Sequence, residues 1–324
     1  MKRRHFLVAL GGAAVSWTFA APAQKPRPRI VFLAGGAAAS INSAYQIRAI
    51  KQGLENNGLI EGRDYIFEPR FATASEDRLA EALRDLARIG VSMILAEAAA
   101  SVRAVQRFAP SAPIVMIAVD DPVGNGLIAS LASPGGHTTG VAAANAELMS
   151  KMLELQRAVL PKGATAALLY DPASAGSLEK MKTRAGAPAI SVVPIPFHSR
   201  NELEAAFDKL ATKPPDAVQI MLDGETSDFM DRIPVLALMH RLPAFANTPE
   251  FATFGGLIGC GPLREQPYLR SGYFVKRILD GVSPADLPVE PPSRIELWIN
   301  QTTARALKLS IPDSLLASAD KIVG

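Results

Sequence analysis

The residues of this sequence that could bind a small molecule stand directly after short apolar runs rich in Val, Ile and Leu. In open parallel sheets, such positions meet at the carboxyl edge of the strands, where ligands bind. A carboxylate there can accept a hydrogen bond from an ammonium group of a ligand, and a tyrosine ring can stack on an apolar group. We therefore expect one crevice lined by Gly36, Ser40, Glu97, Ala98, Ser101, Asp120, Asp121, Tyr170, Asp171, Asp223, Gly224, Asn247 and Glu250.

Each of these residues also has a purely structural interpretation. Asp, Asn and Gly follow strands because they form turns and cap the next helix. Asp121-Pro122 and Asp171-Pro172 are the clearest turn sequences in the set. Glu97 and Tyr170 are not favoured turn residues, so they are the strongest candidates for contact with a ligand.

Motifs for catalysis or for a cofactor are not found. The sequence has no G-x-S-x-G, H-E-x-x-H or G-x-G-x-x-G pattern, and the glycines from Gly135 to Gly140 are followed by Val141 instead of the phosphate-binding Lys. The histidines are far apart and Cys260 is the one cysteine, so no metal spacing is present. We expect no enzyme, no metal and no cofactor; a hydrolase that uses Asp120 or Glu97 is the alternative, without a visible nucleophile.

The elements that must position these residues alternate between strands and helices, which predicts an α/β fold with parallel sheets. In the first half, the pattern predicts strands at 29–33, 65–70, 93–96 and 114–119, each too apolar to face water, and helices at 44–57, 76–89 and 99–108. After an irregular run at 123–141 and a helix at 146–160, a second series begins. Its strands are expected at 165–170, 190–195, 217–222, 244–246 and 257–260, and its helices at 177–184, 201–211 and 227–241.

The length of 324 residues exceeds what one core usually organises, so we expect two Rossmann-like lobes joined by a multi-strand hinge. A helix at 265–280, a Pro-rich connection from Pro284 to Pro292 and a strand at 294–299 predict that the tail crosses back over both lobes. The expected boundaries are residues 24–143 plus about 262–287 for lobe 1, and 144–261 plus about 288–324 for lobe 2.

Residues 1–23 have the form of a secretory signal peptide. Lys2-Arg3-Arg4 precedes an apolar stretch that ends in Ala21-Pro22-Ala23, a small-x-small cleavage pattern. Arg3-Arg4 and the following residues also match the twin-arginine export pattern, with an ordinary Sec signal as the alternative. The expected product is a soluble periplasmic protein, because no Cys near the cleavage site could carry a lipid.

Removal of residues 1–23 takes three of the 34 Lys and Arg residues and none of the 31 Asp and Glu residues, which leaves 31 of each. A formally neutral chain without a basic tract argues against a nucleic-acid partner.

Several long motifs follow one another along the chain: Met1-Lys2-Arg3-Arg4, Gln52-Gly53-Leu54, Gly58-Leu59-Ile60-Glu61-Gly62, Asp121-Pro122-Val123, Gly126-Leu127-Ile128-Ala129-Ser130-Leu131, Pro134-Gly135-Gly136, Thr139-Gly140-Val141, Glu296-Leu297, Ile311-Pro312, Ser314-Leu315-Leu316 and Ala319-Asp320. In these motifs and their order, the chain resembles the ABC-transporter substrate-binding proteins of the tryptophan/tyrosine-binding-like family. The resemblance implies a periplasmic-binding-protein type I fold, a small amino-acid-like or aromatic solute in the inter-lobe cleft, a membrane ABC permease as partner, and a monomer.

At several positions expected near the cleft, this chain has residues that differ from those usual in the family. Glu97 stands where the family usually has a small or hydroxyl residue, and Asp171 stands where it usually has Asn. His137 and Cys260 also differ, so the solute cannot be copied from the family. A periplasmic receptor that feeds a sensor kinase is the alternative function, because it would need the same cleft.

Overall fold

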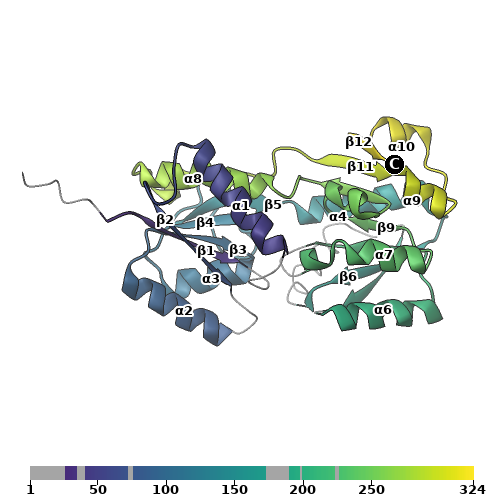
Figure 1. Ribbon diagram of the computed structural model, residues 1–324, viewed down its shortest axis with the longest axis horizontal. Coiled ribbons are helices and arrows are strands. Elements are labelled where there is room, and N and C mark those ends of the chain that lie inside the picture. Colours follow the sequence, from purple (N-terminus) through teal and green to yellow (C-terminus); the bar gives the residue numbers. More distant parts are fainter. Residues whose placement is uncertain (1–25, 35–40, 72–75, 173–189, 198, 223–225) are drawn as a thin grey trace, which may run out of the picture.

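Two open sheets, each covered by helices on both faces, make up the computed structural model (Figure 1). The structure describes residues 26–34, 41–71, 76–172, 190–197, 199–222 and 226–324. The predicted helix at 177–184 lies outside these residues. The fold class expected from the alternating strands and helices, with two parallel-sheet lobes, is confirmed.

Lobe 1 is built on a five-stranded parallel sheet in the order β2-β1-β3-β4-β5. The strands are β1 (Arg29–Ala34), β2 (Ile66–Phe71), β3 (Met93–Glu97), β4 (Ile114–Asp120) and β5 (Thr138–Ala143). One face packs on α2 (Glu76–Ile89) and α3 (Ala99–Phe108), and the other packs on α1 (Ile41–Asn56) and α8 (Gln266–Leu279). Central strand β3 is buried along its whole length, as a strand covered on both faces must be.

Lobe 2 has a seven-stranded sheet in the order β12-β11-β10-β9-β8-β6-β7, in which β11 runs antiparallel to β10. Its strands are β6 (Thr165–Tyr170), β7 (Ser191–Pro196), β8 (Ala217–Ile220), β9 (Ala244–Ala246), β10 (Ile258–Gly261), β11 (Glu296–Asn300) and β12 (Lys321–Val323). α4 (Asn145–Val159), α9 (Gln301–Ala306) and α10 (Asp313–Ala317) cover one face, and α6 (Arg200–Thr212) and α7 (Arg232–Met239) cover the other. Short 3-10 turns are η2 (Thr226–Phe229), η3 (Pro249–Phe254) and η4 (Pro284–Asp286).

The helix ends follow local sequence chemistry. Ser199 caps α6 by accepting a hydrogen bond from the Glu202 backbone N–H at 3.3 Å, in the spacing of a capping box. Gly58 and Gly90, which follow α1 and α2, both have positive φ angles (79° and 73°), the backbone conformation that commonly ends a helix.

The described chain passes between the lobes at three places, all of which Figure 1 shows as segments between the two sheets. β5 leads into α4, β10 leads into α8, and the segment after η4 leads into β11. The third segment pairs with the first, because Glu290 N donates to Gly140 O at 3.0 Å and Ala142 N donates to Glu290 O at 2.8 Å. Three segments of the described chain therefore connect the two lobes.

Several sequence expectations need correction. β5 lies in a run that was expected to be irregular, and the three-residue β12 was not expected. The expected helix at 227–241 is divided into η2 and α7. The expectation that every strand of the first half avoids water is wrong for β2, because it is an edge strand and Ile66 is 37% exposed.

Candidate ligand-binding site

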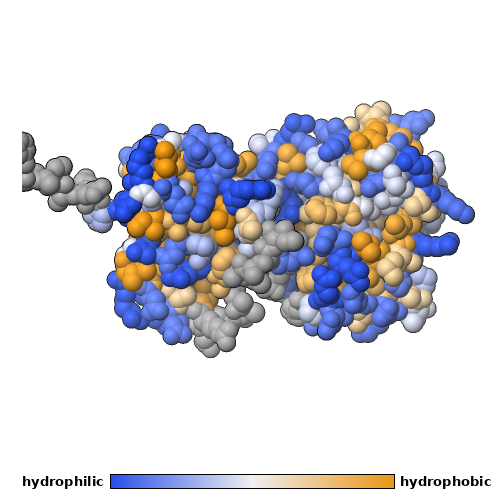
Figure 2. All heavy atoms as spheres, in the orientation of Figure 1, coloured by the Kyte–Doolittle hydropathy of each residue, from blue (hydrophilic) through white to orange (hydrophobic). Residues whose placement is uncertain are grey.

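A cavity of about 1330 Å³ lies between the lobes, at the carboxyl edges of both sheets. Side chains of lobe 1, side chains of lobe 2 and the connecting segments all line it. Figure 2 shows the two lobes as rounded masses with a narrowing between them. The volume exceeds the roughly 300–1,000 Å³ of a typical small-molecule pocket, so the cavity has room for a small solute.

The cavity brings together many of the residues that the sequence singles out. Glu97, Ala98, Ser101 and Asp120 line it from lobe 1, and Tyr170, Asp171 and Asn247 line it from lobe 2. Gly36, Ser40, Asp223 and Gly224 lie outside the described residues. Placement at the cavity does not itself show that a side chain binds ligand, so the binding role of the seven residues stays a prediction.

Asp121 and Glu250 are not among the described residues that line the cavity, which corrects their expected placement. Asp121 has a positive φ angle of 40° and its Oδ1 accepts from the Gly124 backbone N–H at 3.1 Å, so it shapes the turn after β4. Glu250 accepts from the Arg264 backbone N–H at 2.9 Å and from the Thr248 hydroxyl. Its carboxylate therefore fastens η3 to the connecting segment before α8.

The lobe 1 wall contains a hydrogen-bonded cluster of three side chains, which we name the Glu97 cluster: Glu97, Gln46 and Tyr268. Glu97 Oε1 accepts from Gln46 Nε2 at 2.9 Å and from the Tyr268 hydroxyl. Gln46 Nε2 is also 3.0 Å from the Tyr268 oxygen. Burial, and next the negative charge of Glu97, raise the pKa of Tyr268 well above its ordinary value, so the phenol stays protonated and donates a hydrogen bond to the carboxylate.

The backbone next to this cluster adopts an unusual conformation. Ala98 has φ 61° and ψ 145°, a region that residues with a Cβ rarely occupy. The first turn of α3 has no side-chain cap, and Ala99, Ala100 and Ser101 all line the cavity. The positive end of the α3 dipole therefore stands at the cavity, directly after Glu97.

The lobe 2 wall combines an aromatic ring, a carboxylate and an apolar surface. Tyr170 is half-buried at the end of β6, and Asp171 after it is 8% exposed. Asn247 uses its side-chain amide to bind the backbone N–H and C=O of Leu222 at 2.7 and 3.1 Å. It therefore fixes the end of β8 against the segment after β9.

Sequence reasoning missed Gln46, Tyr268 and Arg264. Gln46 and Tyr268 are 222 positions apart on α1 and α8, and neither follows a strand, so no local signal could have joined them. Arg264 comes from the connecting segment; its guanidinium donates to the Asn42 side chain and lies 5.2 Å from the Tyr45 ring centroid. Arg264 thereby ties the connecting segment to lobe 1.

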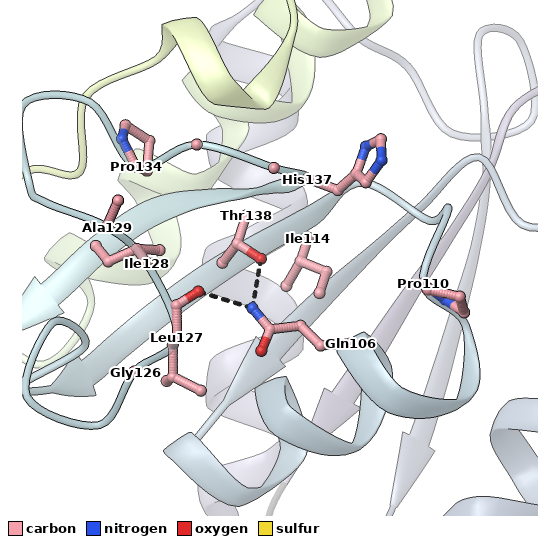
Figure 3. A pocket seen from close by; sticks show the side chains of 12 residues that line it. Gln106, Pro110, Ile114, Gly126, Leu127, Ile128, Ala129, Pro134, His137 and Thr138 are labelled. Carbon is pink, nitrogen blue, oxygen red and sulfur yellow. Dashed lines mark hydrogen bonds between the residues drawn. The ribbon is translucent and has the colours of Figure 1, made fainter.

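A smaller cavity of about 400 Å³ lies in lobe 1 beside the glycines at 135–136 (Figure 3). Gln106 lines this cavity, and its Nε2 donates hydrogen bonds to Leu127 O at 2.8 Å and to Thr138 Oγ1 at 3.0 Å. The amide thus holds the glycine-containing loop against β5.

The described part of the chain contains no group of three His, Cys, Asp or Glu side chains that could hold a metal ion. None of its helices has both the length and the apolar character needed to cross a bilayer.

Two parallel-sheet lobes that enclose a cavity at their strand ends define the class of type I periplasmic binding proteins. Solved structures show the same fold. One is a domain from Streptococcus pneumoniae in complex with L-Trp (TM-score 0.79, 22% identity, 92% of this chain and 100% of that chain). Another is a conserved domain protein from Vibrio cholerae (TM-score 0.79, 22% identity, 91% and 99% of the two chains).

Residues 38–323 match the family model described as ABC transporter substrate binding protein, and this chain belongs to that family. Proteins of this family bind small molecules and work with ABC permeases, and the family is not one of enzymes. The resemblance predicted from the sequence motifs is confirmed. A curated relative, the tyrosine-binding protein of Clostridioides difficile (strain R20291), is 28% identical over 233 residues, which are 71% of this chain and 65% of that protein's length.

Proposed function

We propose that this chain is the extracytoplasmic solute-binding component of an ABC importer and takes an amino-acid-like solute into the cavity between its lobes. The observation that carries this proposal is a cavity that polar side chains of both lobes line. Three segments of the chain connect the two lobes beside it. Family membership supports the proposal. A signal peptide at residues 1–23 would take the protein to the periplasm, where such a component works.

The proposed mechanism is closure about the three crossings. A solute that contacts the Glu97 cluster on one wall and Tyr170 on the other interacts with both lobes only when they approach each other. Because binding free energy then favours the closed arrangement, solute shifts the protein toward a form that the permease can recognise. Ala98, Ser101, Asp120, Asp171 and Asn247 complete the proposed walls.

The solute class is proposed from the walls and from relatives. The named relative is a tyrosine-binding protein, and a protein of similar fold holds L-Trp. Tyr170, Tyr268 and Tyr273 give the cavity aromatic surface, while Glu97 and Arg264 give it groups of both charges. Aromatic surface beside opposite charges suits a zwitterion with an apolar side chain.

Titration calorimetry against the L-amino acids, aromatic acids and short peptides tests the proposal. We expect one class of compound to bind at one site per chain and to be recovered unchanged. Tyr170→Ala should weaken binding about tenfold, since it removes a ring from one wall. Phe254→Ala, which truncates an exposed ring of lobe 2 away from the cavity, is the matched control and should bind normally. Turnover of the bound compound, or binding by none of these compounds, would contradict the proposal.

A further inference from the structure

Two arginines line the inter-lobe cavity, and their surroundings differ. Arg270 on α8 forms a two-point ion pair with Glu290, with N···O distances of 2.7 and 2.8 Å, so its positive charge is neutralised. Arg264, on the segment that leads from β10 to α8, is half-buried and donates to a neutral side chain. The two guanidinium groups therefore differ in what they offer a solute.

The guanidinium of Arg264 contacts three side chains among the described residues. Its Nη2 donates to the Asn42 side-chain oxygen, its Nη1 lies 3.7 Å from the Met230 sulfur, and its Cζ lies 5.2 Å from the Tyr45 ring centroid. Burial raises the pKa of Tyr45 to about 12, so this ring is a neutral phenol. An amide, a thioether and a phenol orient the guanidinium without cancelling its charge.

The acid that binds Arg264 holds its backbone and not its guanidinium. Glu250 Oε1 accepts from the Arg264 backbone N–H at 2.9 Å, and Glu250 Oε2 accepts from the Thr248 hydroxyl. A guanidinium has five N–H donors. In the part of the chain that the structure describes, Asn42 and Met230 take two of them, so others remain for a solute.

Arg264 stands where a solute can meet both lobes. Its side chain contacts α1 of lobe 1, while Glu250 on η3 of lobe 2 holds its backbone, and Leu263 before it also lines the cavity. The positive charge of Arg264 acts on Tyr268, where it opposes the rise in pKa that burial, and next Glu97, cause. The field of the guanidinium therefore reaches the lobe 1 wall of the cavity, where water screens it less than at an open surface.

We propose that Arg264 binds a carboxylate group of the solute, and that the solute is therefore a carboxylic acid. This inference rests on the proposed function of the cavity. The guanidinium N–H groups form a planar fork that matches the two oxygens of a carboxylate. A carboxylate also compensates a positive charge that is partly removed from water, whereas a solute that carries only an amine would be repelled. Asn42, which is not among the described residues that line the cavity, acts as a positioning residue for the fork.

The test compares matched compounds with and without the carboxylate. The probes are tyrosine, tryptophan, leucine and lysine, each with its amide and its decarboxylated amine, in titration calorimetry. We expect every compound that binds tightly to carry the free carboxylate. The amide and the amine of the same compound should bind at least about a hundredfold more weakly.

Two variants, each of which removes one positive charge, complete the comparison. Arg264→Gln should weaken binding of the acid about ten- to a hundredfold, because it removes the fork and keeps an amide that can reach Asn42. Arg277→Gln is the matched control, because Arg277 is exposed on α8 and is not among the described lining residues, and it should bind normally. Thermal melting of the empty proteins identifies any loss of folding.

A third variant separates the binding role of Arg264 from its contact with α1. Asn42→Ala removes the acceptor of the guanidinium and keeps the positive charge. It should lose clearly less affinity for the acid than Arg264→Gln, because the fork remains. Equal losses in the two variants would show that Arg264 only ties the connecting segment to α1, and would overturn the carboxylate site.

The remaining outcomes separate this inference from the proposed function. Equal binding of the acid and its amide, or unchanged affinity in Arg264→Gln, would overturn the carboxylate site and leave the solute-binding function standing. Binding by none of the compounds, with the proteins folded, would overturn both.

Discussion

Glu97 from lobe 1 and Tyr170 from lobe 2 line the same cavity, each at the end of a strand. Glu97 and Tyr170 could be predicted because a turn does not require either type, and both line the cavity. Asp121 could not be distinguished from a ligand contact, because a turn carboxylate and a binding carboxylate look alike in sequence. Gln46 and Tyr268 lie inside helices, where a polar residue usually indicates a solvent-facing side, so only the packing of α1 on α8 reveals them.

Asp320 allows a test of stability against pH at the residue scale. Its carboxylate accepts a hydrogen bond from the Leu297 backbone N–H at 2.9 Å. This hydrogen bond is the main cause that lowers the pKa of Asp320 below its ordinary value, and the contact with Arg294 is a smaller one. A lowered pKa in the folded state means that the stabilisation is complete above the unfolded-state pKa, near 4, and is lost as pH falls through the folded-state value.

Asp320→Ala should therefore melt at a lower temperature than the wild type at pH 7, since β11 loses its contact at Leu297. The difference should shrink below about pH 4. Thermal melting followed by circular dichroism from pH 7 to pH 2.5 measures it. A difference that stays constant over this range would show that the loss arises from packing and not from the carboxylate.

The elements of the fold were the easiest part to predict. Long segments with helical or strand periodicity, such as α2, α3 and β6, have the expected ends. α2 and α3 bury their apolar residues in one core of lobe 1, and β6 is buried on both of its faces in lobe 2. β5 was missed because its sequence, Thr-Thr-Gly-Val-Ala-Ala, has no clear alternation. Gly140 in this strand lies against the Met116 backbone, so the close approach of two strands determines the residue type there.

The packing of α1 on α8 gives a prediction at the element scale. A Cβ at Gly53 would lie 2.3 Å from the Leu269 carbonyl oxygen, so this contact requires glycine. Gly53→Ala should push the helices apart and lower the free energy of unfolding by about 1–3 kcal/mol. It should also weaken solute binding, because these helices carry Gln46 and Tyr268.

Urea unfolding and calorimetry of the same variant measure both effects. Glu55→Ala, an exposed change to the same residue type on the same helix, is the matched control and should alter neither quantity much. Full stability and full affinity in Gly53→Ala would show that the two helices are not held as closely as described.

At the scale of the whole molecule, the repeated alternation of strands and helices along a long chain was enough to predict two lobes. The motifs, which occur in the same order as in the family, were enough to predict the class of protein. The solute could not be predicted in the same way. It depends on how side chains from α1, β3, α8 and lobe 2 meet in space, and on charges that neighbours can cancel, as Arg270 cancels Glu290. Fold follows from periodic features of the chain, whereas specificity follows from a few contacts between distant segments.

The central claim is that one solute binds between the lobes and draws them together. A crystal structure of the protein saturated with a compound that calorimetry shows to bind tests this claim most directly. We predict that the solute contacts the Glu97 cluster and Tyr170 at once, and that the cavity around it is smaller than the 1330 Å³ of this structure. A solute that contacts one lobe alone, with the cavity unchanged, would contradict the account.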